Sequence, residues 1–489
     1  MVKIENVEIN LLRNNKKKGV TKMKNKHFLI SVLTLVLILG YSLSDVYSYP
    51  WFARRLVDNC NKCHVAFPKT NDYGQYVKTT GYELPEIRYE GLEESPIRRF
   101  LRYFPVAARF EVDAINSDPA DVKGDLTFRE IQIISGGSIL NNNVSWWFHK
   151  HIVESNNYVS PFDGTPHEMW GQYNLRFDKS DATRVNLRYG MSELPLRFSP
   201  SKTNVIESSF AIYNASLGGN SFRFSLPQYG AYLNATRLGG ENTNEVKSNL
   251  SLGLVNGTAD FSSHDFTQVF GRVSTTVSKV MLGAFTYVGS GNILMAMDEH
   301  NEDQGDEHVE DPPADHGDEH GEEIAEELMK MDNNFYRVGM DFDTYLTSKF
   351  NLFGLALYGR DSNPLGLAQA ASGNYYGGFI GLDYSPSERL MLSTRFDFVR
   401  FGGLPAEEHA DDLGDEHGEE MPMEEGELMA EAGGHGGHGE LLTSNTDAMV
   451  FGLNFLPIPR YYQLRLTAEY RMAFQGLSDR LLVGFQYAL

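Results

Sequence analysis

The stretch Leu481–Leu489, LLVGFQYAL, decides the fold because its side chains alternate in character. Successive side chains of a strand point to opposite faces of a sheet, so residues two apart share a face. One such set is entirely apolar, and the other is mixed and includes Gln486. The apolar set is Leu481, Val483, Phe485, Tyr487 and Leu489. The pattern predicts a strand whose two faces meet different environments.

The same alternation runs back along the chain to about Phe104, in segments of roughly ten residues separated by turn-forming residues. Examples are DLTFREIQII, SWWFHKHIV, VMLGAFTYVG, FNLFGLALYGR and LMLSTRFDFVRF. We count about sixteen such segments, which is the signature of a transmembrane β-barrel. We therefore predict an all-β fold, a transmembrane antiparallel barrel of about 16 strands over residues 104–489. An array of soluble β-sandwiches is the alternative.

An export signal favours the barrel over the soluble array. Basic residues precede an apolar run, Phe28–Leu39, of 12 residues, which is too short to span a bilayer and suits a cleaved signal peptide. We assign residues 1–48 to an N-terminal extension and secretory signal, with Met23 as an alternative start and maturation near Tyr49. An exported chain of 489 residues with only 2 cysteines also fits a barrel better than a disulfide-bonded array.

The net charge of −22 is concentrated in two segments, 298–332 and 406–440, which are rich in Asp, Glu and His. The rest of the mature chain is nearly balanced and has no basic stripe, which argues against a nucleic-acid partner. The predicted connections alternate between short and long. Because bacterial barrels have short periplasmic turns and longer outer loops, we expect both acidic segments to face the cell exterior and the C-terminus to be periplasmic.

Both cysteines lie in one motif, Cys60-Asn61-Lys62-Cys63-His64. This spacing is that of covalent c-type haem attachment, with two thioethers and the following imidazole as an iron ligand. A zinc site would need four protein ligands, and no other Cys or His lies between Tyr49 and Tyr103. A redox disulfide would need a thioredoxin-like setting that the flanking sequence lacks. We predict one haem c bound by Cys60 and Cys63, with His64 as the axial ligand, in a segment covering residues 49–103.

The second axial ligand is absent from that segment, which offers no Met and no further His. His149 and His151 are two apart and therefore share one strand face with Trp147. We take these two histidines as the distal-ligand candidates. His167, Met169 and Met191 are further candidates of lower rank. The alternative is that His149 and His151 are merely polar residues facing the lumen.

The stretch WFARRLVDNCNKCHVAFPKTNDYGQYVKTTGY resembles the haem segment of the outer-membrane cytochrome-porin fusions of iron-oxidising bacteria. The shared features are Phe52-Ala53-Arg54, the haem motif, Phe67-Pro68-Lys69, Asn71, Gly74 and Gly81-Tyr82. Thr70 departs from the Leu that such proteins generally carry. The family's order of signal, one haem segment and a porin barrel covers this whole chain.

The resemblance implies Fe(II) oxidase activity without covalent substrate chemistry. Electrons would pass from extracellular Fe(II) through the haem to a periplasmic c-type cytochrome. A barrel of this size leaves an aqueous lumen, and we expect the haem segment to plug it. Two other functions remain open at this point. One is electron export to external acceptors, and the other is a metal-responsive porin for divalent cations.

The two acidic segments carry eight of the 14 histidines: His300, His308, His316, His320, His409, His417, His435 and His438. Imidazole mixed with carboxylate suits borderline divalent metals. We consider iron handling, binding of another metal such as zinc, copper or nickel, and a purely hydrated anionic loop as the three interpretations. No single residue of these segments is assigned to a site.

Overall fold

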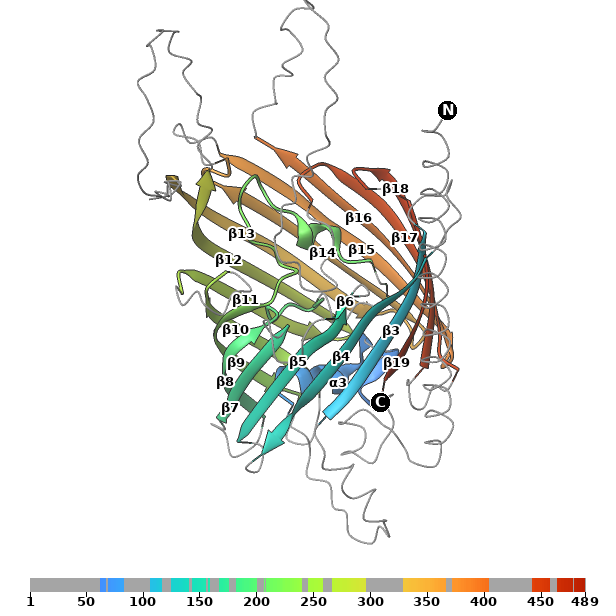
Figure 1. Ribbon diagram of the computed structural model, residues 1–489. Helices are drawn as coiled ribbons and strands as arrows, with labels where there is room; N and C mark the ends of the chain where they lie inside the picture. The colour runs from blue at the N-terminus through green and yellow to red at the C-terminus, as the bar shows by residue number, and fades with distance from the viewer. Residues whose placement is uncertain are drawn as a thin grey trace, which may run out of the picture.

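The computed structural model describes residues 62–66, 69–82, 106–116, 125–139, 143–154, 157–158, 167–175, 182–199, 206, 208–239, 245–257, 266–295, 329–365, 372–403, 442–457, 464–477 and 479–488. Cys60 and most of the two acidic segments lie outside these residues. In the described part, sixteen antiparallel strands close into one barrel, which confirms the predicted fold (Figure 1). A two-residue strand, β6, lies between β5 and β7.

The wall strands follow one another around the barrel in chain order, and the last, β19, pairs with the first, β3. Closure leaves no unpaired strand edge, as a bilayer requires. The strands are β3 Val106–Asn116, β4 Asp125–Ile139, β5 Val144–Glu154, β6 Asn157–Tyr158, β7 Glu168–Leu175, β8 Thr183–Ser192, β9 Gln228–Leu238, β10 Val246–Val255, β11 Gln268–Val277, β12 Val280–Met295, β13 Met329–Tyr345, β14 Phe350–Asp361, β15 Gly373–Ser387, β16 Leu390–Gly402, β17 Thr446–Phe455, β18 Leu464–Gln475 and β19 Arg480–Ala488.

The outer face of the wall is apolar and the inner face carries most of the charge. On β11, Val269 and Val273 are more than half exposed on the outside, whereas Arg272 between them is buried inside. The pattern inverts that of a soluble protein, because the outer side chains face lipid. Among the described residues no helix has the length and apolar character needed to cross a membrane.

Short connections gather at one end of the barrel. Ser278 and Lys279 alone join β11 to β12, and residues 346–349 join β13 to β14. The connections that contain the two acidic segments leave from the opposite end, between β12 and β13 and between β16 and β17. We call these the short-turn end and the long-loop end. The predicted alternation of connection lengths is therefore present in the structure.

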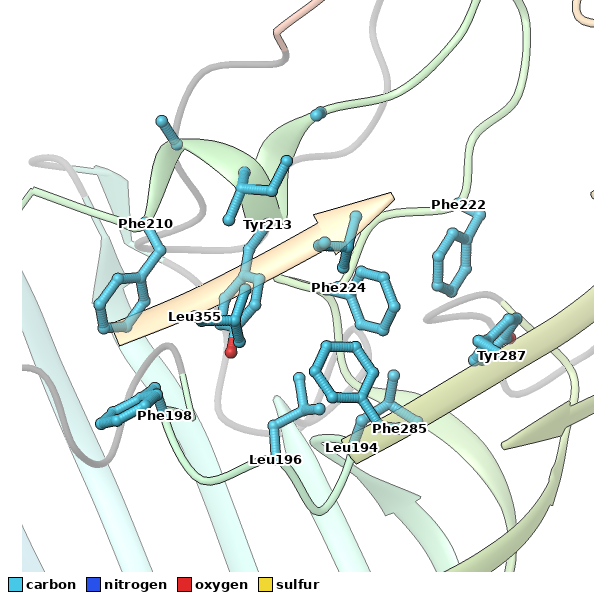
Figure 2. Close-up of a cluster of buried hydrophobic side chains, with 14 of the residues drawn as sticks. Leu194, Leu196, Phe198, Phe210, Tyr213, Phe222, Phe224, Phe285, Tyr287 and Leu355 are labelled. Atoms are coloured by element: carbon cyan, nitrogen blue, oxygen red, sulfur yellow. The ribbon is translucent and has the colours of Figure 1, made fainter. Parts of the chain in front are cut away.

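The described residues of the connection between β8 and β9, which are 193–199, 206 and 208–227, fold into the lumen instead of extending from it, and we call them the inserted segment (Figure 2). It contributes a short 3-10 helix, η2 (Ala211–Asn214), and a set of apolar side chains that are almost fully buried. These are Leu194, Leu196, Phe198, Phe210, Ile212, Tyr213, Phe222 and Phe224, packed on Phe285, Tyr287, Phe335, Phe353, Leu355 and Phe379 of the wall. From the sequence we expected residues 49–103 to fill the lumen, and the structure adds this second segment.

Replacing Phe210 with Ala tests the packing of the inserted segment. Phe210 is 1% exposed and stacks on Phe379 with ring centroids 4.3 Å apart. Losing such a ring leaves a cavity that costs about 3–5 kcal/mol. We expect a lower guanidinium midpoint for Phe210→Ala than for the parent in detergent micelles. Leu346→Ala, at a turn position that is 57% exposed, should leave the midpoint unchanged, and equal midpoints for all three proteins would contradict the packing.

Candidate functional site

Of the five positions of the haem motif, the structure describes Lys62, Cys63 and His64. Strand β1 (His64–Ala66) pairs with β2 (Lys69–Thr70), and helix α3 (Asp72–Thr79) follows. We call the described residues 62–66 and 69–82 the plug. Figure 1 shows α3 within the barrel near its short-turn end.

Asn71 connects the motif to the helix. Its side chain accepts a hydrogen bond from the Gly74 amide at 3.0 Å, which caps α3. Its own amide donates to the Cys63 carbonyl at 2.9 Å, and its side-chain nitrogen donates to the Lys62 carbonyl at 3.0 Å. A Cβ on Gly74 would lie 2.1 Å from the Cys63 carbonyl oxygen. Asn71 and Gly74 thus hold the cysteine-bearing turn against the start of the helix.

The other end of α3 is attached to the wall at β5, β7 and β8. The helix stops at Gly81, where φ is +74°, and the Tyr82 amide donates back to the Val77 carbonyl at 2.7 Å. The Thr80 carbonyl accepts hydrogen bonds from Asn186 at 2.8 Å and from Gln172 at 3.3 Å.

Tyr82 extends this attachment. Its ring stacks on Trp147 and on Trp170, with centroids 5.0 Å and 5.6 Å apart. The Arg188 guanidinium lies 3.9 Å from the Trp170 ring centroid. The plug therefore contacts this side of the wall through both backbone and aromatic groups.

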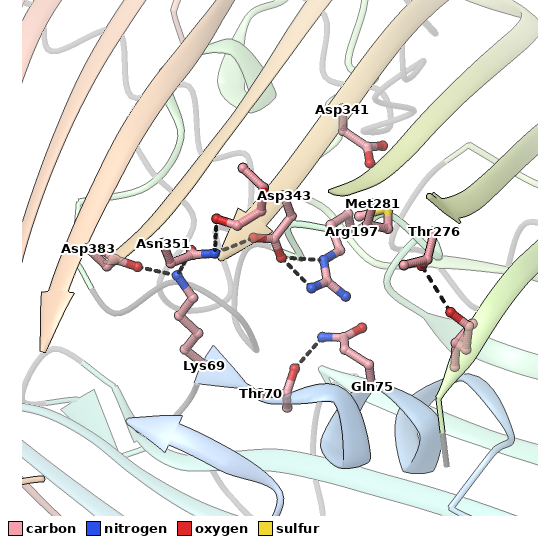
Figure 3. Close-up of polar contacts among 12 residues, drawn as sticks. Lys69, Thr70, Gln75, Arg197, Thr276, Met281, Asp341, Asp343, Asn351 and Asp383 are labelled. Carbon is pink, nitrogen blue, oxygen red and sulfur yellow. Dashed lines mark hydrogen bonds and ion pairs between the residues drawn. The ribbon is translucent and has the colours of Figure 1, made fainter. Parts of the chain in front are cut away.

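Lys69 attaches the plug to β14 and β15 (Figure 3). Its ammonium donates to the Asn351 side chain and pairs with Asp383, which is 2% exposed. It also lies 4.6 Å from the centre of the Phe353 ring. Strands β7–β8 and β14–β15 lie on nearly opposite sides of the closed strand order. The plug therefore crosses the lumen from wall to wall.

The same polar cluster joins the plug to the inserted segment. Asn351 donates to Asp343 at 2.6 Å, and Asp343 accepts from the Arg197 Nε at 2.8 Å. Burial acts to lower the pKa of Arg197, but Asp343, Tyr345 and Asp341 together raise that pKa above its usual value. Arg197 and Asp343 are therefore held as a charged pair.

A cavity of about 510 Å³ lies between α3 and the wall. Asp72, Gln75 and Tyr82 of the plug line one side of it, and Arg188 and Arg272 line the other. Residues of the short turns also line it, so it lies toward the short-turn end. Its size is in the range of small-molecule and cofactor pockets.

Cys63 is partly buried and packs against an apolar group formed by Tyr76, Val77 and Leu238. His64 follows it and is also partly buried. The Cys63 thiol therefore lies beside an apolar surface, which is compatible with a porphyrin next to it. Cys60 lies outside the described residues.

The distal-ligand candidates fall on two faces of the wall. His149 and His151 are buried on the inner face, as their spacing predicts, and the structure brings His167 beside them. Met169 is 44% exposed on the outer face. Met191 is its cross-strand partner but is only 1% exposed. Met169 is therefore wrong as a candidate, because strand alternation directs its side chain away from the lumen, whereas Met191 stays a prediction.

Several residues of the site were not singled out from the sequence. Lys69 and Asp383 are 314 positions apart and meet only through barrel closure. Glu168 accepts from the Trp147 indole at 3.1 Å and from the Glu193 amide at 3.0 Å. Its position directly opposite His149 follows from the pairing of β5 with β7. Knowledge of the strand register between β5 and β7 would have identified Glu168 as a neighbour of His149.

The chain matches no protein-family model and no curated protein sequence. It is similar to solved outer-membrane channels. DcaP of Acinetobacter baumannii gives a TM-score of 0.45 at 9% identity, over 78% of this chain and 96% of that chain. OmpT of Vibrio cholerae gives 0.44 at 7% identity, over 78% and 96%. OmpF of Salmonella typhi in complex with daunomycin gives 0.43 at 10% identity, over 78% and 97%.

Exchanging the charges of Lys69 and Asp383 tests whether the plug is fixed to the wall. Each single variant, Lys69→Asp or Asp383→Lys, places like charges together in a buried site. Breaking a buried pair costs about 3–5 kcal/mol. We expect raised conductance in planar bilayers for either single variant and recovery of the parent's low conductance in the double variant. Asp447→Asn, which breaks a pair at a more exposed position, is the control. Unaltered conductance in both single variants would show that Lys69 does not hold the plug.

Proposed function

We propose that this protein is an outer-membrane electron conduit. It would carry one c-type haem in its plug and oxidise extracellular Fe(II), passing single electrons to a periplasmic c-type cytochrome. One observation carries the proposal: the described part of the haem motif begins a plug that is attached to opposite walls of a closed barrel. A cofactor on this plug would lie inside the wall that separates the two aqueous phases.

The residues divide the work of holding the cofactor. Cys60 and Cys63 would form the two thioethers, and His64 would supply the axial nitrogen. Bound there, the haem supplies a reversible one-electron carrier. Asn71 and Gly74 hold the backbone of Cys63, while Tyr82 and Lys69 fix the plug against the two walls. His149 and His151 remain candidates for the distal position.

The filled lumen supports conduction of electrons over diffusion of solutes. The plug and the inserted segment both occupy the interior, and the second brings a cluster of buried aromatic rings. Electrons can pass a packed interior, whereas hydrated cations need a water-filled path. The cavity beside α3, lined partly by the short turns, leaves room on that side for the approach of an acceptor.

The proposed orientation places the short turns and the C-terminus in the periplasm, since bacterial barrels have their short turns there. Both acidic segments then face the exterior, where Fe(II) arrives. The apolar outer face of the wall supports outer-membrane lipid as the surrounding phase.

Removing one cysteine tests the cofactor. We expect Cys60→Ala, produced with the c-type haem maturation machinery, to lose the covalent haem band of outer-membrane fractions. Asn61→Ala, inside the same motif, should keep the band because Asn61 contributes neither thioether nor ligand. When Fe(II) is mixed anaerobically with the parent protein, the haem should become reduced promptly, as its absorption spectrum reports. A colourless parent, or a haem that stays oxidised, would defeat the proposal.

Transport across a membrane separates the conduit from the porin alternative. Liposomes containing the protein would enclose either oxidised cytochrome c or an Fe(II)-specific chelating dye, with Fe(II) added outside. The conduit predicts reduction of the enclosed cytochrome while the enclosed dye stays uncoloured. Colouring of the dye at the same rate would favour a porin for divalent cations. Reduction of external Fe(III) by an enclosed low-potential donor, without the forward reaction, would favour electron export.

A further inference from the structure

Three imidazoles gather on the inner face of the wall. His149 and His151 are two apart on β5, and His167 directly precedes β7. Their ring centroids lie 5.0 Å apart for His149–His151, 4.9 Å for His149–His167 and 5.4 Å for His151–His167. All three side chains are buried, with at most 7% exposed. They come from two strands that pair directly.

We propose that His149, His151 and His167 form a binding site for a first-row divalent cation, in which case His149 and His151 do not ligate the haem iron. Imidazole nitrogen is a ligand that Fe, Zn, Cu and Ni share. The role of the site, holding Fe(II) while its electron leaves for the haem, rests on the proposed function. The binding of a cation by these three residues stands independently of it.

The spacing of the rings matches what one metal needs. A metal–nitrogen bond is about 2.1 Å, which puts each ring centre about 3 Å from the metal and the centres of three tetrahedral ligands about 5 Å apart. The three observed separations lie close to this value. Within the described residues no group of His, Cys, Asp and Glu presents a finished metal site. Binding therefore requires the imidazoles to turn about χ2, a torsion with a broad energy profile.

Carboxylates and an amide surround the three rings. The Nε2 atom of His151 lies 3.1 Å from the Gln132 Nε2 and 3.5 Å from the Glu130 carboxylate. Glu168 lies opposite His149 in the strand pairing and is fixed by Trp147 and the Glu193 amide. Carboxylates next to metal-binding imidazoles orient the rings and offset the charge of the cation. Glu130 and Glu168 are the positioning residues of the proposed site.

The site is adjacent to the plug, on its long-loop side. Trp147 shares the inner face of β5 with His149, two residues away, and stacks on Tyr82 of the plug. From Trp147, β5 runs through His149 and His151 toward the long-loop end. A cation that enters from that end would meet the three imidazoles before it reaches the plug.

Metal binding by the haem-loaded protein tests the site. Equilibrium dialysis against buffered anaerobic Fe(II), and separately against Zn(II), would count the bound equivalents. We expect the variant His149→Gln/His151→Gln/His167→Gln to lose one tight equivalent relative to the parent. The single variant His149→Gln, which is milder for folding, should bind that equivalent at least 10-fold more weakly, because loss of an outer-shell partner of a ligand alone costs about 10–100-fold. X-ray absorption of the zinc-loaded parent should report three imidazole nitrogens.

The control removes three histidines from an acidic segment, as His308→Gln/His316→Gln/His320→Gln. This variant should keep the tight equivalent. If the wall variants bind both metals as tightly and in the same number as the parent, the three histidines are only packed polar residues and the inference is overturned. Loss of the equivalent from the loop control, with the wall variants intact, would overturn it equally.

Kinetics separates this inference from the proposed function. Half-saturation of haem reduction by Fe(II) should rise at least tenfold in His167→Gln, with the haem spectrum and potential unchanged, because His167 is not one of the two distal-ligand candidates of the proposed function. If the parent haem is reduced by Fe(II) and the variant has the same half-saturation, the donor site lies elsewhere although the proposed function stands. If the tight metal equivalent is present but Fe(II) never reduces the haem, the proposed function fails although the site exists.

Discussion

The structure depends on one constraint: in lipid, every backbone amide and carbonyl must find a partner within the protein. Sixteen strands meet this constraint by closing on themselves. Closure forces alternate side chains inward around a lumen too wide for the wall's own side chains to fill. The plug and the inserted segment fill it from within the same chain. Everything proposed about function follows from what these two segments place inside the wall.

The interior is charged, and its charges are matched across strands. Arg337 pairs with Asp361 at 2.6 Å and Arg272 pairs with Asp341 at 2.8 Å, both almost without exposure. Removing one partner of such a pair would leave an uncompensated buried charge. Lys69 brings one further cation to this interior, and Asp383 receives it. The plug is therefore held by the same kind of interaction that organises the wall.

The local sequence pattern was sufficient to predict the strands of the barrel wall. It was insufficient to predict the segments that fill the lumen. Period-two alternation predicted the strands and the shared inward face of His149 and His151, and the alternation of connection lengths predicted that the short turns gather at one end. It could not place His167 beside them, because that contact depends on the register of β5 with β7. Phe198, Phe210 and Phe222 follow no strand period, so the inserted segment left no recognisable signal. Met169 was wrong because the inward parity of its strand had not been worked out.

The plug, the aromatic contacts of Tyr82 and the three histidines form one continuous region on the inner face of β5 and β7. The central claim is that the plug resides in the lumen and does not extend into the periplasm. Photo-crosslinking from Tyr82→p-benzoylphenylalanine in intact cells, read by mass spectrometry, tests it most directly. The account predicts crosslinks to peptides containing Trp147 or Trp170. Crosslinks to periplasmic proteins, with none to β5 or β7, would contradict it.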